Sequence, residues 1–148
     1  MKALYAIALA AAFLVPALPV AAADPAKPAA ASAAQKYRVV IQVSDPDPKL
    51  WAQGINYTEN LQQLLGKENV EVEVVALGQG IGLLKLDSPH AERVADALKR
   101  GVKLSACQST MKRQKLSKED MLPAIGYVPG GLIRIIDLQR QGWSYIKG

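Results

Sequence analysis

The sequence has little of the chemistry that most catalytic and metal sites use. Among its 148 residues there is one cysteine, Cys107, and one histidine, His90. A single cysteine excludes a disulfide within the chain. One cysteine and one histidine are also too few for a metal site built from four such side chains. We therefore expect no metal, and no motif in the sequence requires a cofactor.

A long apolar run is also missing. The N-terminal stretch Ala3–Val15 is uncharged and apolar but has only 13 residues, whereas a stable membrane span needs about 20. Lys2 precedes this stretch, and Ala21 and Ala23 follow it in the A-x-A pattern of a cleavage site. The sequence predicts a signal peptide over residues 1–23, a periplasmic or secreted protein, and no stable membrane insertion after cleavage.

The residues after the predicted cleavage site divide into two parts. Residues 24–36 are rich in Ala and Pro and show no apolar period, which is typical of a flexible tether. Residues 37–148 are numerous enough for one domain with its own core and too few for two.

Acidic residues are absent from one long window. The chain has a formal net charge of +5, and residues 99–118 contain seven basic side chains and no acidic ones. Basic proteins often bind nucleic acid, but an exported protein would not meet it, so we expect no nucleic-acid partner. Because Cys107 lies inside the window, the charge indicates a local positive field around the thiol.

Apolar strand-like runs alternate with helical patterns. Helices are expected at 48–66 and 88–101, and each ends at a glycine, Gly66 or Gly101. A short helical or irregular piece follows residue 107. Strands are expected at 37–43, 70–78, 102–107 and 132–138, with a short fifth at 143–147. This alternation predicts an α/β domain with three layers, flavodoxin-like, built on a mostly parallel sheet of about five strands.

In such a fold, ligands bind at the carboxyl ends of the strands. The ends predicted here carry residues 44–47, 78–82, 107–110 and 137–139. The first turns of the following helices share this rim, which adds Asn56 and His90. The motif VPGG at 128–131 would enter the fourth strand, and we therefore expect it at the opposite end of the sheet.

Cys107 lies where the third strand ends. If residues 108–112 form one helical turn, the free N–H groups of Gln108 and Thr110 face the sulfur. Lys112 and Arg113 add positive charge, so a pKa below the usual value of about 8.5 is predicted. The alternative is a buried, structural cysteine, as most free cysteines are. His90 either pairs with Cys107 or is an exposed residue in the first turn of a helix.

The glycines at 78–82 resemble a dinucleotide-binding loop only weakly. The next helix does not begin at the glycines, and Cys107 stands where a ribose-binding carboxylate is expected. We instead expect Gly78 and Gly80 to bring backbone N–H groups close to the thiol and form an anion site. Asn56 is a poor residue for a helix interior, which suggests a hydrogen bond to a neighbouring loop.

Three segments together resemble the DsrE/DsrF-like family of sulfur-relay proteins, over about residues 37–148. They are VEVEVVALGQGIGLL, LKRGVKLSACQSTM and YVPGGLIRIIDLQRQGWSYIKG. The strongest matches are GVKLSAC, with Thr110 three residues on, and VPGG followed by LQRQGWSYI. Asn60 also resembles a recurring family position.

The resemblance implies a flavodoxin-like fold, oligomers of the trimer or hexamer type, and a cysteine that carries sulfur as a persulfide. Cys107 matches that cysteine. The resemblance therefore predicts a periplasmic sulfur-carrier protein with sulfur donor and acceptor proteins, or small anionic sulfur species, as partners. The signal peptide departs from the members that give the family its name, which work in the cytoplasm. The alternatives are a non-enzymatic oligomeric module that binds a small anion or a partner protein, and a redox role in which Cys107 pairs between subunits.

Overall fold

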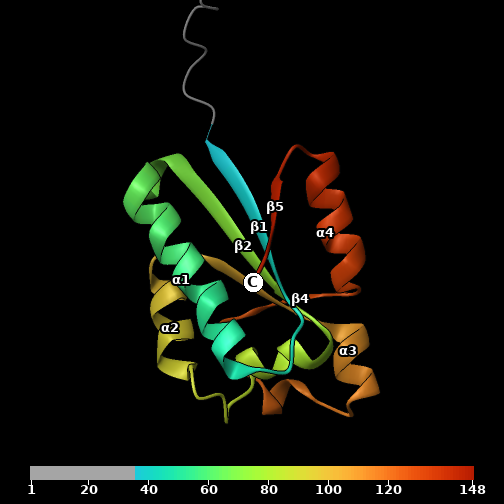
Figure 1. Cartoon of the computed structure of the whole chain (residues 1–148). Coiled ribbons are helices and arrows are strands. Elements are labelled where there is room, and N and C mark those ends of the chain that lie inside the picture. Colours follow the sequence, from blue (N-terminus) through green and yellow to red (C-terminus); the bar gives the residue numbers. More distant parts are fainter. Residues whose placement is uncertain (1–35) are drawn as a thin grey trace, which may run out of the picture. The chain divides into compact units, whose positions relative to one another are not determined.

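A computed structural model describes residues 36–148, and every structural statement below concerns those residues. Their centre is a five-stranded sheet in the order β4-β3-β2-β1-β5, with each neighbouring pair of strands parallel (Figure 1). The flavodoxin-like three-layer α/β class predicted from the sequence is confirmed. The predicted signal peptide, and the predicted tether apart from Lys36, lie outside the described residues.

Twelve elements follow one another along the described chain, and three of them are short 3-10 helices. The strands are β1 (Tyr37–Val43), β2 (Val70–Ala76), β3 (Lys103–Cys107), β4 (Gly126–Val128) and β5 (Ser144–Lys147). The α-helices are α1 (Pro48–Leu65), α2 (Ala91–Lys99), α3 (Gln108–Arg113) and α4 (Gly131–Arg140). The 3-10 helices are η1 (Lys67–Asn69), η2 (Gly78–Leu84) and η3 (Lys118–Asp120).

Local signals in the sequence set the ends of the longest helix. Asp47 accepts a hydrogen bond from the N–H of Lys49 at 2.9 Å and caps α1, and Pro48 occupies its first turn, where a missing N–H costs nothing. Gly66 ends the helix with φ at +85°, a left-handed conformation that a side chain would disfavour. The predicted boundaries 48–66 therefore hold within one residue.

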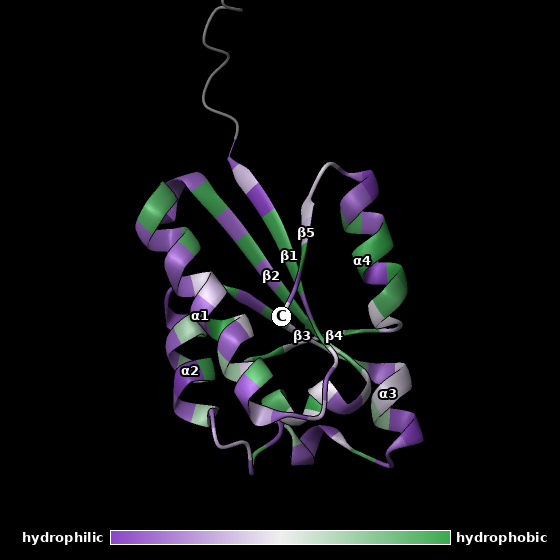
Figure 2. Cartoon of the chain, in the orientation of Figure 1, coloured by the Kyte–Doolittle hydropathy of each residue, from purple (hydrophilic) through white to green (hydrophobic). Residues whose placement is uncertain are grey.

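One face of the sheet carries the larger core. Alternate residues of the strands, such as Val39 and Ile41 of β1 and Val72 and Val74 of β2, point to this face and are buried against α1 and α2. Figure 1 shows these two helices together on one side of the sheet. Figure 2 shows the same division as apolar bands along the strands flanked by polar outer helix faces.

The other face is covered by α4. Val40 and Val75 pack there against Ile135, Leu138 and Trp143. The helix crosses from β4, at one edge of the sheet, to β5 at the other edge, next to β1. Its N-terminus therefore comes to the carboxyl ends of β2 and β3, on the face to which Cys107 points.

Two predictions for the C-terminal part of the chain are wrong. Residues 132–138 belong to helix α4 rather than to a strand, and the fourth strand is the short run Gly126–Val128. The residues buried in α4 are Gly131, Ile135 and Leu138, which follow the spacing of a helix face. As a result, the VPGG motif follows β4 and lies at the carboxyl end of the sheet, not at the opposite end.

Within residues 36–148, no helix is both long enough and apolar enough to cross a membrane.

Candidate functional site

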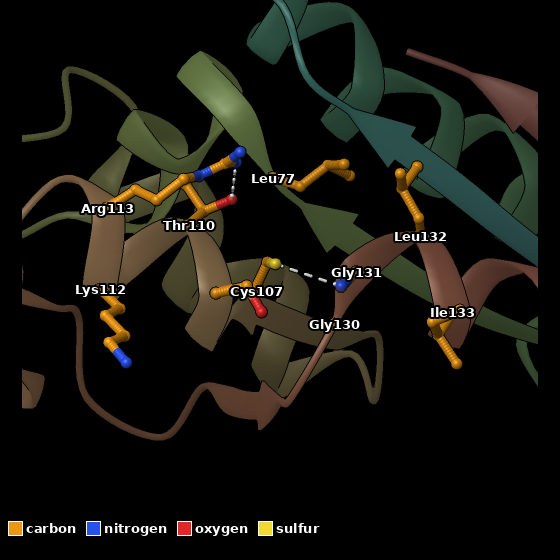
Figure 3. A pocket seen from close by; sticks show the side chains of 10 residues that line it. Leu77, Cys107, Thr110, Lys112, Arg113, Gly130, Gly131, Leu132 and Ile133 are labelled. Carbon is orange, nitrogen blue, oxygen red and sulfur yellow. Dashed lines mark hydrogen bonds between the residues drawn. The ribbon is translucent and has the colours of Figure 1, made fainter.

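A cavity of about 370 Å³ opens between the N-termini of α3 and α4, and Cys107 lies in its wall (Figure 3). Cys107 is the last residue of β3 and directly precedes α3. One group of lining residues comes from α3 and another from the turn and first residues of α4. The lining consists of Leu77, Cys107, Ser109, Thr110, Lys112, Arg113, Gly130, Gly131, Leu132 and Ile133.

The Cys107 side chain is almost fully covered by its neighbours. The residue is 4% exposed, and its sulfur accepts a hydrogen bond from the N–H of Gly131 at 3.1 Å. This N–H is one of the free donors at the start of α4, where the positive end of the helix dipole favours a negative charge. The sulfur thus meets the N-terminus of a ten-residue helix as well as the start of α3.

Hydrogen bonds outweigh burial in setting the ionisation of Cys107. Burial opposes the charged form, but hydrogen bonds from the Thr110 hydroxyl and from the N–H groups of Gly131, Thr110 and Ser109 favour it, and together they lower the pKa of Cys107. The Ser109 N–H contributes least, and it also donates to the carbonyl of Pro129 at 3.2 Å. A thiol with a lowered pKa is more often the thiolate, which is the nucleophilic form.

Thr110 connects the thiol to the end of the neighbouring strand. Its hydroxyl bonds the Cys107 sulfur and accepts a hydrogen bond from the Gly78 N–H at 3.1 Å. Because an O–H group has one hydrogen to donate, accepting from Gly78 leaves that hydrogen free for the sulfur. The Gln114 amide also donates to the Gly78 carbonyl at 2.9 Å, which fixes α3 on this loop. Gly78 therefore acts on the thiol through Thr110 rather than directly.

The two basic residues of the cavity differ in direction. Arg113 reaches the Thr110 hydroxyl at 3.4 Å, whereas Lys112 extends away from the sulfur (Figure 3). The sequence predicted that these cations would lower the pKa of Cys107, but the causes found in the structure are hydrogen bonds. Lys112 and Arg113 instead place positive charge at the mouth of the cavity.

The other predicted site residues lie outside the cavity lining. Gly80 is packed against the backbone at the end of β1, and Gln108 is exposed on the outer side of α3, next to Lys118 and Tyr127. Asn56 belongs to α1 on the other face of the sheet, where its side-chain oxygen accepts a hydrogen bond from Arg93 at 2.6 Å. The expected hydrogen bond of Asn56 is therefore made to helix α2 and not to a loop.

His90 and residues 137–139 are also separate from Cys107. The His90 ring lies 2.8 Å from the carbonyl oxygen of Pro48, at the start of α1, so it does not pair with the thiol. Residues 137–139 form part of the last turns of α4, far along the helix from the cavity. Among residues 36–148, no group of three or more His, Cys, Asp or Glu side chains gathers as a metal site would require.

Sequence reasoning missed the α4 side of the cavity altogether. Gly130 and Gly131 approach the sulfur, and Leu132 and Ile133 follow them along the mouth, 60% and 61% exposed. A signal was present: the expected strands 132–138 and 143–147 are four residues apart, whereas adjacent parallel strands need a crossover of a dozen or more. A helix at 131–140 satisfies that requirement and brings the two glycines to the thiol.

The DsrE/DsrF-like family matches the chain over residues 27–147. A search among curated proteins finds no match. Among solved structures, a protein of unknown function from Methanobacterium thermoautotrophicum, MTH1491, is 31% identical, with a TM-score of 0.73, over 76% of this chain and 100% of that chain.

Two more distant structures share the fold. A conserved protein of unknown function from Bacteroides thetaiotaomicron, BT1422, is 12% identical with a TM-score of 0.62, over 75% of this chain and 94% of that one. The ychN protein from E. coli is 9% identical with a TM-score of 0.61, over 77% and 99%. Since the family match spans almost all of the described residues and the fold agrees, the chain belongs to the DsrE/DsrF-like family.

Proposed function

We propose that this protein is a sulfur carrier that holds sulfane sulfur as a persulfide on Cys107. Membership of the DsrE/DsrF-like family suggests a sulfur-relay-like role. The observation that supports the finer assignment is the set of donors around the sulfur, which come from Thr110, Gly131 and Ser109. Donors in this arrangement stabilise a sulfur anion, and a carrier needs that anion twice, as the attacking thiolate and as the bound persulfide.

The transfer step requires no external oxidant or reductant. The Cys107 thiolate attacks the outer sulfur of a donor R–S–SH, the sulfur–sulfur bond of the donor breaks, and R–S⁻ leaves while Cys–S–SH forms. With thiosulfate the leaving group is sulfite. Delivery of the sulfur is the same reaction with Cys107 as the donor. An acceptor thiolate attacks the outer sulfur of the Cys107 persulfide, and Cys107 leaves as the thiolate.

The charge at the cavity mouth fits the proposed cargo. Lys112 and Arg113 border the opening, and both persulfides and thiosulfate are anions. Their positive field would raise the local concentration of such donors and make capture faster at low ionic strength. We therefore expect the rate of sulfur loading to fall as salt is added.

The place of action and the partners also belong to the proposal. The expected signal peptide would place the carrier in the periplasm or outside the cell. There the sulfur would come from anionic sulfur compounds or from a donor protein and pass to an acceptor thiol. The family resemblance adds an expected homo-oligomer, a trimer or hexamer.

Intact mass measurement tests the carrier. After incubation with polysulfide or thiosulfate and removal of the excess, the wild type should gain about 32 Da, the mass of one sulfur, in a form that dithiothreitol removes. Cys107→Ser should show no gain, and Thr58→Val, a change at a buried residue of α1 on the other face of the sheet, should load like the wild type. Equal loading of wild type and Cys107→Ser, or no loading of either by any donor, would remove the proposal.

A second function is favoured by the apolar mouth of the cavity. Leu132, Ile133 and Ile136 on α4 are exposed, and Cys107 is almost covered. A non-enzymatic oligomeric module, with Cys107 structural, would have the same features. Such a module predicts slow alkylation of native Cys107 and fast alkylation after unfolding, whereas the sulfur carrier predicts fast alkylation of the native protein.

A further inference from the structure

A charged pair joins α4 to the face of the sheet that this helix covers, with the Arg134 side chain 35% exposed. Glu73 of β2 is 1% exposed, and its carboxylate accepts hydrogen bonds from Arg134 Nε at 3.0 Å, from Arg134 Nη2 at 2.7 Å and from Ser105 Oγ at 3.0 Å. Burying a carboxylate is costly even when it is paired, and apolar residues of similar size often serve stability as well or better. Stability alone therefore does not account for the pair.

The pair joins the helix to the sheet at one defined position. Two parallel hydrogen bonds between a guanidinium and a carboxylate fix direction as well as distance. At the two ends of α4, Gly131 donates to the Cys107 sulfur and Arg38 donates to the Gln141 carbonyl. Between these ends the helix also packs on the sheet through Ile135 and Leu138, and such apolar contacts have little directionality. The pair of Arg134 and Glu73 is the two-pronged contact among these, and it limits rotation and sliding of the helix next to its first turn.

Arg134 stands one helical turn from the donor that meets the thiol. Gly131 precedes it by three residues, and the Arg134 N–H bonds the carbonyl of Gly130 at 2.9 Å. The sheet repeats this spacing: Ser105, which bonds Glu73, is two residues before Cys107 on β3 and points to the same face. The ion pair is therefore connected to the sulfur in two ways, along α4 from Arg134 to Gly131 and along β3 from Ser105 to Cys107.

We propose that Glu73 and Arg134 are positioning residues for Cys107, because their ion pair holds the first turn of α4 where the Gly131 N–H donates to the sulfur. Neither side chain touches the cavity, so neither is a catalytic residue. The inference rests on the proposed function for its purpose. The ionisation of the thiol, however, can be measured without any sulfur transfer.

The direction in which the pKa of Cys107 moves in Glu73→Gln separates positioning from a direct effect of charge. Glu73→Gln keeps the size of the side chain and an oxygen for Ser105, but its NH₂ group cannot accept from Arg134, so the paired contact is lost. Removing a negative charge favours the thiolate and by itself lowers the pKa of Cys107. Loosening of the Gly131 hydrogen bond raises the pKa of Cys107, and we expect this effect to prevail, by about one pH unit.

A matched control lies on the same strand. Glu71 also sits on β2, points to the same face and pairs with a lysine, Lys103, which belongs to β3 and not to α4. Glu71→Gln makes the same chemical change without touching the helix. The thiol pKa of this variant should equal that of the wild type or lie slightly lower.

Two further variants keep the test open if Glu73→Gln does not fold. Arg134→Lys retains both charges but gives a single contact in place of two. The double variant Glu73→Gln/Arg134→Met removes both charges, so no unpaired charge remains buried. If the pair serves only stability, the folded double variant will have the thiol pKa of the wild type.

The experiment is titration of the thiolate by its absorbance near 240 nm, with iodoacetamide alkylation rates measured over the same pH range and circular dichroism as the check on folding. A raised thiol pKa in the folded Glu73→Gln and double variants, with Glu71→Gln unaffected, supports the proposal. An unchanged or lowered thiol pKa in the folded variants overturns it. Failure of the wild type to take up sulfur would remove the proposed function and leave this result standing.

Discussion

Replacing Thr110 by valine tests how the thiol is ionised. Valine has nearly the shape of threonine, and Thr110 is buried, so the change removes the hydroxyl with little change in packing. Three interactions disappear: the hydrogen bond to the Cys107 sulfur, the acceptor of the Gly78 N–H at 3.1 Å, and the long contact with Arg113 at 3.4 Å. The first affects the thiolate and the second affects stability.

The size of each effect follows from the kind of hydrogen bond. A bond to a charged group contributes about 1.5–3 kcal/mol, and a pKa change of one unit corresponds to about 1.4 kcal/mol. Complete loss would therefore raise the pKa of Cys107 by about 1–2, and water entering the adjoining cavity reduces this to about 1. Leaving the Gly78 N–H without an acceptor should lower the free energy of unfolding by about 1–2 kcal/mol.

The assay is the rate of iodoacetamide alkylation against pH, whose midpoint gives the thiol pKa. Thr110→Ser keeps the hydroxyl and should keep the midpoint near that of the wild type. Thr58→Val is the control for placing valine at a buried threonine, because Thr58 lies on α1 and bonds only within its helix, to the Ile55 carbonyl at 2.8 Å. If Thr110→Val leaves the midpoint unchanged or lower, the Thr110 hydroxyl is not what lowers the pKa of Cys107.

Three other predictions follow from the same structure. Gly131→Ala should slow alkylation of Cys107 and destabilise the protein by about 1 kcal/mol or more, since a Cβ there would lie 3.2 Å from the Cys107 Cβ and push α4 away. Gly130→Ala, whose Cβ would lie 3.7 Å from its nearest neighbour, should change neither the alkylation rate of Cys107 nor the free energy of unfolding in urea. Gly82→Ala should cost about 3 kcal/mol in urea unfolding, because the new methyl would overlap the Trp51 ring; a loss below about 1 kcal/mol would contradict the packing. Finally, because the folded protein has the lower thiol pKa, the stability that Cys107 contributes is lost as pH falls through the folded pKa and is complete above the unfolded value of about 8.5. The difference in unfolding free energy between wild type and Cys107→Ala, measured in reductant, should therefore grow in favour of the wild type from pH 6 to pH 9, and a flat or opposite trend would contradict the lowered pKa.

The sequence was informative wherever a local signal determines the structure. Strand β1 is a buried β-branched run, and α1 has its cap and its terminal glycine. The placement of Cys107 at the end of β3 followed from the same kind of signal. These features depend on neighbours within a few residues, and for that reason they can be recognised from the chain alone.

Residues 132–138, which were expected to form a strand, show where local sequence signals fail to identify the secondary structure. In LIRIIDL the residues Ile135 and Leu138 are buried while Leu132, Ile133 and Ile136 are exposed, but all five are apolar, so the pattern has no clear helical period. β-branched residues then favoured a strand. Because of this error Gly131 was expected at the wrong end of the sheet, and its N–H was not recognised as a hydrogen-bond donor to the Cys107 sulfur.

Two causes of a lowered thiol pKa were expected, N–H groups at the start of a helix and nearby cations, and the structure shows the first but not the second. Lys112 and Arg113 are near Cys107 in sequence, but a short helix turns the Lys112 side chain outward and engages Arg113 with Thr110. The donors that matter include one from a segment 24 residues away, Gly131. Contacts of this kind depend on how distant segments pack, which sequence spacing does not report.

The position of β5 beside β1 has a consequence for how the chain folds. Val39 pairs with Ser144, so β1 meets its second partner only after the whole segment between them, including β2, β3 and β4, has been synthesised. Until then β1 has an open hydrogen-bonding edge, a site where two unfinished chains can associate. Contacts between such distant segments also slow folding. We therefore expect the nascent protein, more than the finished one, to depend on chaperones.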